Sequence, residues 1–252
     1  MNNEKIPLIH NYCDRWCERC TFTSRCAIYE DESDIPEEER DANNQAFWKK
    51  LEENFAKARE ILQKAAAEAG FNLEPTSEEL EEAEEREDAM RLQISQHPIS
   101  VLTLEYAKVA RTWLKTQPGM LDRLEDLKQE LILGVESEQG AKQQTATIRE
   151  SLSVIQWYLH FIHVKFTRAL MSRMQDDYIE GREDYDYDSN GSAKIALIAI
   201  ERSMQAWSEL FSILPREEDH FLKVLSMLDN VRTRALNEFP EAMAFVRPGF
   251  DD

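Results

Sequence analysis

The residues best suited to chemistry in this sequence are its four cysteines, Cys13, Cys17, Cys20 and Cys26, which all lie within fourteen residues. Their spacing is C-x3-C-x2-C-x5-C. Thiols this crowded cannot form a disulfide framework for a chain of 252 residues, and a redox-active pair needs only two of them. The spacing therefore predicts a metal site with thiolate ligands.

Two kinds of metal centre use four cysteine ligands: a structural zinc ion and an iron-sulfur cluster. The C-x3-C-x2-C opening is similar to that of radical enzymes whose cluster leaves one iron open for a nucleotide cofactor. Those enzymes bring a β/α barrel, which this sequence does not predict, and Cys26 is available to close the site. We therefore expect zinc, with a closed iron-sulfur cluster and free or redox-active thiols as the alternatives.

The residues around the cysteines suit a metal site. If residues 13–20 are helical, three thiols lie on one helix face and Cys26 can fold back to complete a tetrahedron. Arginines and aromatic residues alternate with the cysteines: Arg15, Arg19, Arg25, Tyr12, Trp16 and Phe22. The arginines would offset the negative charge and donate hydrogen bonds to sulfur, while the rings would exclude water. His10 is a further donor nearby, although a lone histidine is more typical of a surface.

A second candidate site is a polar seam on the helix predicted over residues 146–175. Its members follow a helical repeat: Ser153, Gln156, His160, His163 and Thr167. Buried polar groups need partners, so the seam is either a metal or proton-handling site or a hydrogen-bonded helix interface. Two histidines without convincing carboxylates favour the interface.

Glu217 and His220 match the Glu-x-x-His element of a ferritin-like di-metal site. Glu217, however, lies in the first turn after Pro215, where the helix dipole favours an acid. The carboxylates of Glu105 and Glu201 fall on solvated helix faces. A bundle metalloenzyme of the oxidase type is therefore the alternative function. Its candidate catalytic residues are His160, His163, Glu217 and His220.

Asp186, Asp188 and Asn190, followed by Gly191, fit the first half of a calcium-binding loop, D-x-D-x-N-G. The second half does not fit, because the twelfth position is Leu197 where a glutamate is needed. The segment is therefore an incomplete calcium site or a helix connection in which Asn190 or a neighbouring serine caps the next helix. No glycine-rich phosphate loop or nucleophile elbow occurs, which argues against the common transferase and hydrolase classes.

Helices must position all of these residues. Only 7 glycines and 8 prolines occur, and no strand-like alternation is found, so we expect an all-α fold. Apolar residues recur every three or four positions in about seven stretches: residues 45–69, 76–94, 102–113, 120–131, 146–175, 192–214 and 215–239. We expect loops over residues 136–145 and 176–191.

The predicted domain organisation has four parts. Residues 1–29 are a four-cysteine metal-binding module that folds on metal binding, and residues 30–44 are an acidic linker. Residues 45–239 form a multi-helix bundle, and residues 240–252 are an irregular C-terminal tail.

The net charge limits the possible partners. The sequence has 30 basic and 49 acidic residues, a formal net charge of -19, which disfavours nucleic acid and anionic membrane surfaces. No stretch approaches the ~20 apolar residues of a membrane span, and the first residues lack a secretion signal. We therefore expect a cytoplasmic interaction or regulatory protein whose acidic surface meets a basic protein partner.

Overall fold

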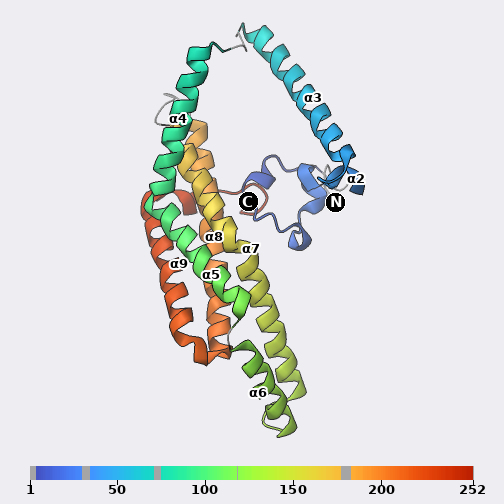
Figure 1. The fold of residues 1–252 in the computed structure, drawn as a ribbon, viewed down its shortest axis with the longest axis vertical. Coiled ribbons are helices and arrows are strands. Elements are labelled where there is room, and N and C mark those ends of the chain that lie inside the picture. Colours follow the sequence, from blue (N-terminus) through green and yellow to red (C-terminus); the bar gives the residue numbers. More distant parts are fainter. Residues whose placement is uncertain (1–3, 30–34, 71–74, 118, 177–182, 252) are drawn as a thin grey trace. The chain divides into compact units, whose positions relative to one another are not determined.

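The computed structural model describes residues 4–29, 35–70, 75–117, 119–176 and 183–251, with all of their side chains except those of residues 37, 176, 183–187 and 215. Every regular element in these ranges is helical, so the all-α prediction is confirmed (Figure 1). The chain divides into two compact units. The first comprises Met1–His10 and Cys17–Ala89, and the second comprises Asn11–Trp16 and Met90–Asp252.

The described part of the first unit holds short turns, the long helix α3 and most of the helix α4. Its elements are η2 (Cys17–Arg19), η3 (Thr23–Arg25), α2 (Glu37–Arg40), α3 (Gln45–Ala69) and most of α4 (Ser77–Gln96). Asn44 begins α3 by accepting a hydrogen bond from the Ala46 N–H at 3.0 Å. Gly70 ends α3 in the left-handed conformation, with φ 73°. The predicted bounds of this helix are therefore confirmed.

Thr76 and Glu79 form a capping box at the start of α4. The Thr76 N–H donates to Glu79 at 2.8 Å, and the Glu79 N–H donates to Thr76 at 3.2 Å. The segment predicted to be an acidic linker, residues 30–44, contains the helical turn α2. Residues 30–34 lie outside the described residues.

The second unit is a helical bundle. Its elements are α5 (Pro98–Thr116), α6 (Met120–Ile132), α7 (Glu138–Asp176), α8 (Glu183–Ile213), η4 (Pro215–Glu217), α9 (Glu218–Glu238) and η5 (Ala242–Ala244). The helices α7 and α8 form the most extensively packed pair, α5 packs against α7 and α9, and α9 packs against α8. Near its start, α7 meets α6 (Figure 1). None of the described helices combines the length and apolar character needed to cross a bilayer.

The core of the bundle lies around α7 and α8. Its largest fully buried aromatic residues are Tyr106, Tyr158, Phe166, Trp207, Phe221 and Phe239. Small buried residues on α8 allow neighbouring helices to approach closely: Ala193, Ala196, Ala199 and Ala206. The helix predicted over residues 146–175, which lies within α7, contributes Ile155, Tyr158, Ile162 and Phe166 to this core, although Val164 is 58% exposed.

The loop predicted over residues 136–145 is wrong, because α7 begins at Glu138. Ser137 starts the helix: its hydroxyl accepts a hydrogen bond from the Gly140 N–H at 2.9 Å. A serine followed by polar residues and a glycine has the composition of a loop, but the serine here serves as a helix cap and the glycine is tolerated inside the helix.

The loop predicted over residues 176–191 is also wrong in its second part, because α8 begins at Glu183 rather than at Ser192. Asn190 and Gly191 suggested a turn. A Cβ atom at Gly191 would lie 2.5 Å from the Tyr12 ring and 2.8 Å from the Phe245 ring. The glycine is therefore explained by close side-chain packing against a helix.

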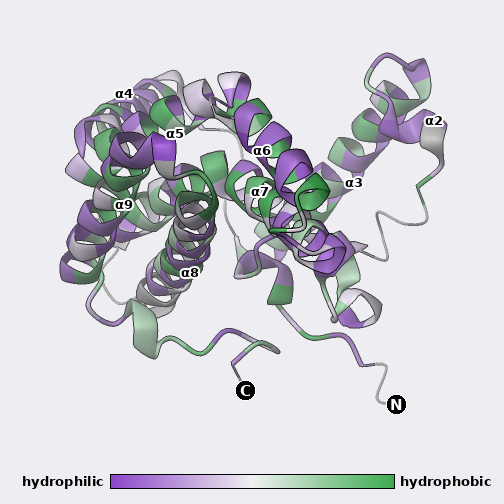
Figure 2. Cartoon of the chain, turned by 90° about the horizontal axis from the view of Figure 1, so that it is seen from below, coloured by the Kyte–Doolittle hydropathy of each residue, from purple (hydrophilic) through white to green (hydrophobic). Residues whose placement is uncertain are grey.

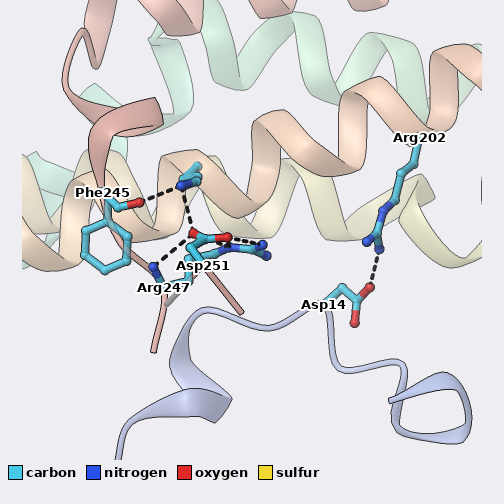
Figure 3. A network of polar contacts seen from close by, with 6 residues as sticks. Asp14, Arg202, Phe245, Arg247 and Asp251 are labelled. Atoms are coloured by element: carbon cyan, nitrogen blue, oxygen red, sulfur yellow. Dashed lines mark hydrogen bonds and ion pairs between the residues drawn. The ribbon is translucent and has the colours of Figure 1, made fainter. Parts of the chain in front are cut away.

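The tail over residues 240–252, predicted to be irregular, is ordered against the bundle in its described part. Ala242 and Phe245 are buried. On α8, Lys194 donates to the Phe245 carbonyl at 2.6 Å and lies 2.8 Å from an Asp251 oxygen (Figure 3). Arg247 also pairs with Asp251 at 2.8 Å. These contacts fix the chain end beside α8, which no helical periodicity could predict.

Candidate functional site

The cysteine segment is not the helix that would place three thiols on one face. Only Cys17–Arg19 forms a 3-10 turn. Arg15, just before it, has φ 58°, a left-handed conformation that interrupts a right-handed helix. All four cysteines are outside disulfides and partly exposed. The expected helical arrangement of ligands is therefore wrong.

Three of the cysteines belong to the first unit and lie in tight turns. The Cys20 N–H donates to the Cys17 carbonyl at 3.2 Å, and the Phe22 N–H donates to the Cys20 Sγ at 3.4 Å. The Arg25 side chain donates to the Glu4 carbonyl at 3.1 Å. The Arg25 Nε–H therefore bonds to a backbone carbonyl and not to a cysteine sulfur.

The described side chains do not gather into a ready-made metal centre. Among them, no group of three or more histidine, cysteine, aspartate or glutamate residues could hold a metal ion. The residues required by the cysteine hypothesis are present, but a tetrahedral arrangement is not. Zinc or iron-sulfur binding by Cys13, Cys17, Cys20 and Cys26 stays a prediction.

The remaining cysteine, Cys13, belongs to the second unit, in a segment we call the strap, Asn11–Trp16. Two aromatic residues anchor the strap on the bundle. Trp16 stacks on Trp157 of α7, with ring centroids 4.8 Å apart and an interplanar angle of 13°. Tyr12 is 3% exposed and meets Phe245 edge to face at 4.8 Å. These contacts bury apolar surface on both sides of Cys13.

Asp14 adds a polar clamp next to Cys13. Its Oδ2 accepts a hydrogen bond from the Tyr158 hydroxyl at 2.8 Å. The same oxygen accepts one from Arg202 at 2.6 Å (Figure 3). Its backbone carbonyl accepts a hydrogen bond from the Trp157 indole at 2.9 Å. One strap residue thus connects to both α7 and α8. Burial raises the pKa of Tyr158 to about 12, and the hydrogen bond from Arg202 acts in the opposite direction without cancelling this effect.

Burial also affects Cys13 itself. It raises the pKa of the Cys13 thiol, which favours the neutral form in the absence of metal. Lys165 of α7 is buried and donates to the Asn11 carbonyl at 2.8 Å. Burial lowers the pKa of Lys165 to about 8. A thiol here is held in a partly dry environment beside a cationic lysine.

The calcium-loop prediction is wrong in its geometry, because residues 186, 188 and 190 lie within α8. The Asp186 side chain is outside the described side chains, and Asn190 is partly buried in the helix. Asp188 accepts hydrogen bonds from Arg168 at 3.1 Å and from Ser172 at 2.7 Å. Tyr12 of the strap donates to it at 3.2 Å. Burial acts to raise the pKa of Asp188, but these hydrogen bonds outweigh it and lower the pKa.

The two histidines of the α7 seam contact α5. His163 Nδ1 lies 2.9 Å from the hydroxyl of the buried Thr103, and His160 contacts Arg111. Burial lowers the pKa of both histidines. A threonine and an arginine are partners of a helix interface, and an arginine beside His160 disfavours a second cation. His160 and Gln156 are exposed, so this part of the seam is not buried as expected.

Glu217 and His220, the proposed Glu-x-x-His pair, lie on elements other than α7. Glu217 ends η4, while His220 is on α9 and stacks on Trp113 at 5.6 Å and 15°. Trp207 also meets the His220 ring edge-on, with ring centroids 5.7 Å apart. Burial, and then the charge of Lys223, lower the pKa of His220. The histidine therefore belongs to an aromatic cluster of the core.

The strap is the functional feature that the sequence pattern did not predict. A signal for it exists, because Trp157 lies on a second apolar side of α7, opposite the main stripe. That second side indicated only a central helix. Its partner is Trp16, which lies among the cysteines. Comparison with protein-family models, with curated proteins and with solved structures gives no match. Functional inference must therefore rest on this chain's own residues.

Proposed function

We propose that this chain is a metal-binding interaction protein, in which Cys13, Cys17, Cys20 and Cys26 hold one structural zinc ion. The observation that carries the proposal is the fixed position of Cys13. The strap is held by Asp14 and by the stacked Trp16, so one thiol is anchored before any metal arrives. An anchored ligand lowers the ordering cost of metal binding.

The spacing of the other thiols supports closure around a metal. Cys17 follows Cys13 by four positions, so their Cα atoms are at most ~14 Å apart by chain length. The N–H donated to Cys20 Sγ is a contact of the kind that stabilises a thiolate ligand. Zinc binding then pulls the segment into a tetrahedron with sulfur ligands at ~2.3 Å. A closed iron-sulfur cluster on the same ligands is the alternative.

An interaction role is supported by charge and by exposed apolar groups. The net charge of -19 favours a basic protein partner. Large apolar side chains are exposed on α3 and around α6: Trp48, Phe55, Ile61, Leu62, Leu121, Ile132, Leu133 and Val135. Groups of such residues mark protein contacts more often than isolated ones do. The bundle-oxidase alternative lacks similar support, because the contacts of His160, His163 and His220 suit packing.

The proposal is tested by removing one ligand. Wild-type chain, Cys20→Ser and the matched control His10→Ala are purified without oxygen, and their zinc content is measured by mass spectrometry. We expect about one zinc per chain in the wild type and in His10→Ala, and a loss of most zinc in Cys20→Ser. Full zinc retention by Cys20→Ser would overturn the four-cysteine site. Bound iron together with visible absorption would show that the site holds an iron-sulfur cluster and not zinc.

A further inference from the structure

The helix α3 carries the sequence pattern of a coiled-coil seam. Seven residues alternate at three- and four-residue steps over three heptads: Trp48, Leu51, Phe55, Ala58, Leu62, Ala65 and Ala69. They therefore lie along one side of the helix, in the positions called a and d. Figure 2 shows hydrophobic residues recurring along α3 among hydrophilic ones.

This seam is open to solvent within the first unit. Trp48 is 57% exposed, Phe55 is 64% exposed and Leu62 is 60% exposed. Within the first unit, α3 packs against the short α2, where Lys50 lies 3.6 Å from Glu39. In proteins most helical stability comes from packing an apolar face against a neighbour. An exposed apolar seam along α3 therefore favours a partner.

We propose that α3 pairs with α3 of a second copy of this chain in an antiparallel two-helix coiled coil. In that orientation each a position faces a d position of the other helix. Trp48 faces Ala65 of the second copy, Phe55 faces Ala58, and Leu62 faces Leu51. Each aromatic ring thus meets a small residue, which fills every layer evenly.

The parallel orientation fits poorly. It sets Trp48 against Trp48 and Phe55 against Phe55, while Ala58 faces Ala58 and Ala65 faces Ala65. Crowded layers would alternate with empty ones, and both overpacking and cavities destabilise an interface. The order of large and small residues along the seam therefore favours the antiparallel pair.

Charge supports the same orientation. Glu52 and Arg59 occupy e positions beside the seam. In an antiparallel pair e positions lie near each other, so Glu52 of each copy approaches Arg59 of the other. The twofold symmetry makes this ion pair twice. The lysines Lys50, Lys57 and Lys64 lie away from this edge.

The size of the contact is sufficient, and the next long helix along the chain, α4, is a poor substitute. Four aromatic side chains bury about 150–250 Å² each. Together with the leucines they reach the ~1,200 Å² of a specific interface. In α4 the corresponding heptad of Leu80, Ala83, Met90 and Ile94 is interrupted by Glu87. A charge at a core position costs more than an apolar residue there.

The mass of the full chain tests the proposal. Sedimentation equilibrium is measured with reductant, and with and without a chelator, so that failure of the zinc proposal does not affect the result. We expect the wild type to reach twice 29.4 kDa. Phe55→Glu should weaken association at least tenfold, and the exposed control Lys57→Glu should not. Circular dichroism checks that the bundle stays helical. A monomeric wild type, or a Phe55→Glu dimer of unchanged affinity, would overturn the proposal.

A charge exchange tests the orientation. Glu52→Arg alone and Arg59→Glu alone each place like charges together and should weaken the dimer severalfold. The double variant exchanges the two charges and should restore the wild-type dissociation constant. If the double variant is as weak as the singles, the antiparallel arrangement is wrong.

Discussion

Gly191 is the residue of α8 against which the strap packs most closely. It lies inside α8, where glycine weakens a helix by about 1 kcal/mol relative to alanine. The Tyr12 and Phe245 rings occupy the space that a Cβ atom would need. The glycine therefore keeps the strap and the chain end against the helix, at the expense of helix propensity.

Gly191→Ala should lower the free energy of unfolding by about 1–3 kcal/mol, since the overpacking outweighs the gain in helix propensity. Urea unfolding followed by circular dichroism measures the change. The same substitution should cost less in a Tyr12→Ala background, because the ring that it meets is gone. If Gly191→Ala stabilises the wild-type chain, the close approach of Tyr12 is contradicted.

His220 gives a pH-dependent prediction. Its folded-state pKa lies below the usual value, first because of burial and second because of Lys223. The unfolded chain therefore binds the proton first as the pH falls through about 6.5. Stability from this residue is fully present above that pH and is lost below it.

Replacing His220 by phenylalanine should reduce the loss of unfolding free energy between about pH 7.5 and about pH 5.5. Phenylalanine keeps a ring beside Trp113 and Trp207 but has no proton to bind. Urea unfolding at the two pH values gives the difference for each protein. Equal differences for the wild type and the variant would show that His220 does not contribute in this way.

At the scale of elements, the helices with an uninterrupted apolar repeat are predicted well. The bounds of α3 follow from its stripe and from Gly70, and the start of α4 follows from Thr76 and Glu79. The sequence predicts later starts for α7 and α8 than the structure shows, because serine and glycine each occur both in loops and in helices. Ser137 caps α7, and Gly191 lies inside α8 against two rings. A serine caps a helix or forms a loop, and a glycine makes a turn or admits a ring.

The candidate site is likewise predicted only in part from the sequence. The four cysteines are visible from their spacing, but their position depends on tertiary contacts that have no local signal. Asp14 meets Tyr158 and Arg202, which are far away along the chain. The strap is an irregular element, so no periodicity predicts it. The aromatic residues near the cysteines were expected to shield a metal, whereas Trp16 and Tyr12 anchor the segment on the bundle.

The strap as an element should detach when its clamp is removed. Asp14→Ala removes the acceptor of two hydrogen bonds, and we expect a loss of about 1–3 kcal/mol of unfolding free energy. Cys13 should then react faster with a thiol reagent in the metal-free, reduced chain. The control Glu18→Ala removes the same charge from an exposed position and should change neither quantity. Unchanged thiol reactivity in Asp14→Ala would argue against the clamp.

In the whole molecule, one boundary between the two compact units falls within the cysteine segment, between Trp16 and Cys17. The bundle has its own buried core, and the strap belongs to the same compact unit as the bundle. The cysteines after the strap belong to the other unit. Metal binding by all four thiols would therefore have to order the cysteine segment itself.

Zinc K-edge X-ray absorption on protein purified without oxygen tests this central claim most directly. The account predicts about one zinc per chain with four sulfur neighbours at ~2.3 Å. Cys20→Ser serves as the control and should lose that signal. Protein without zinc, or zinc surrounded only by nitrogen and oxygen, would contradict the account.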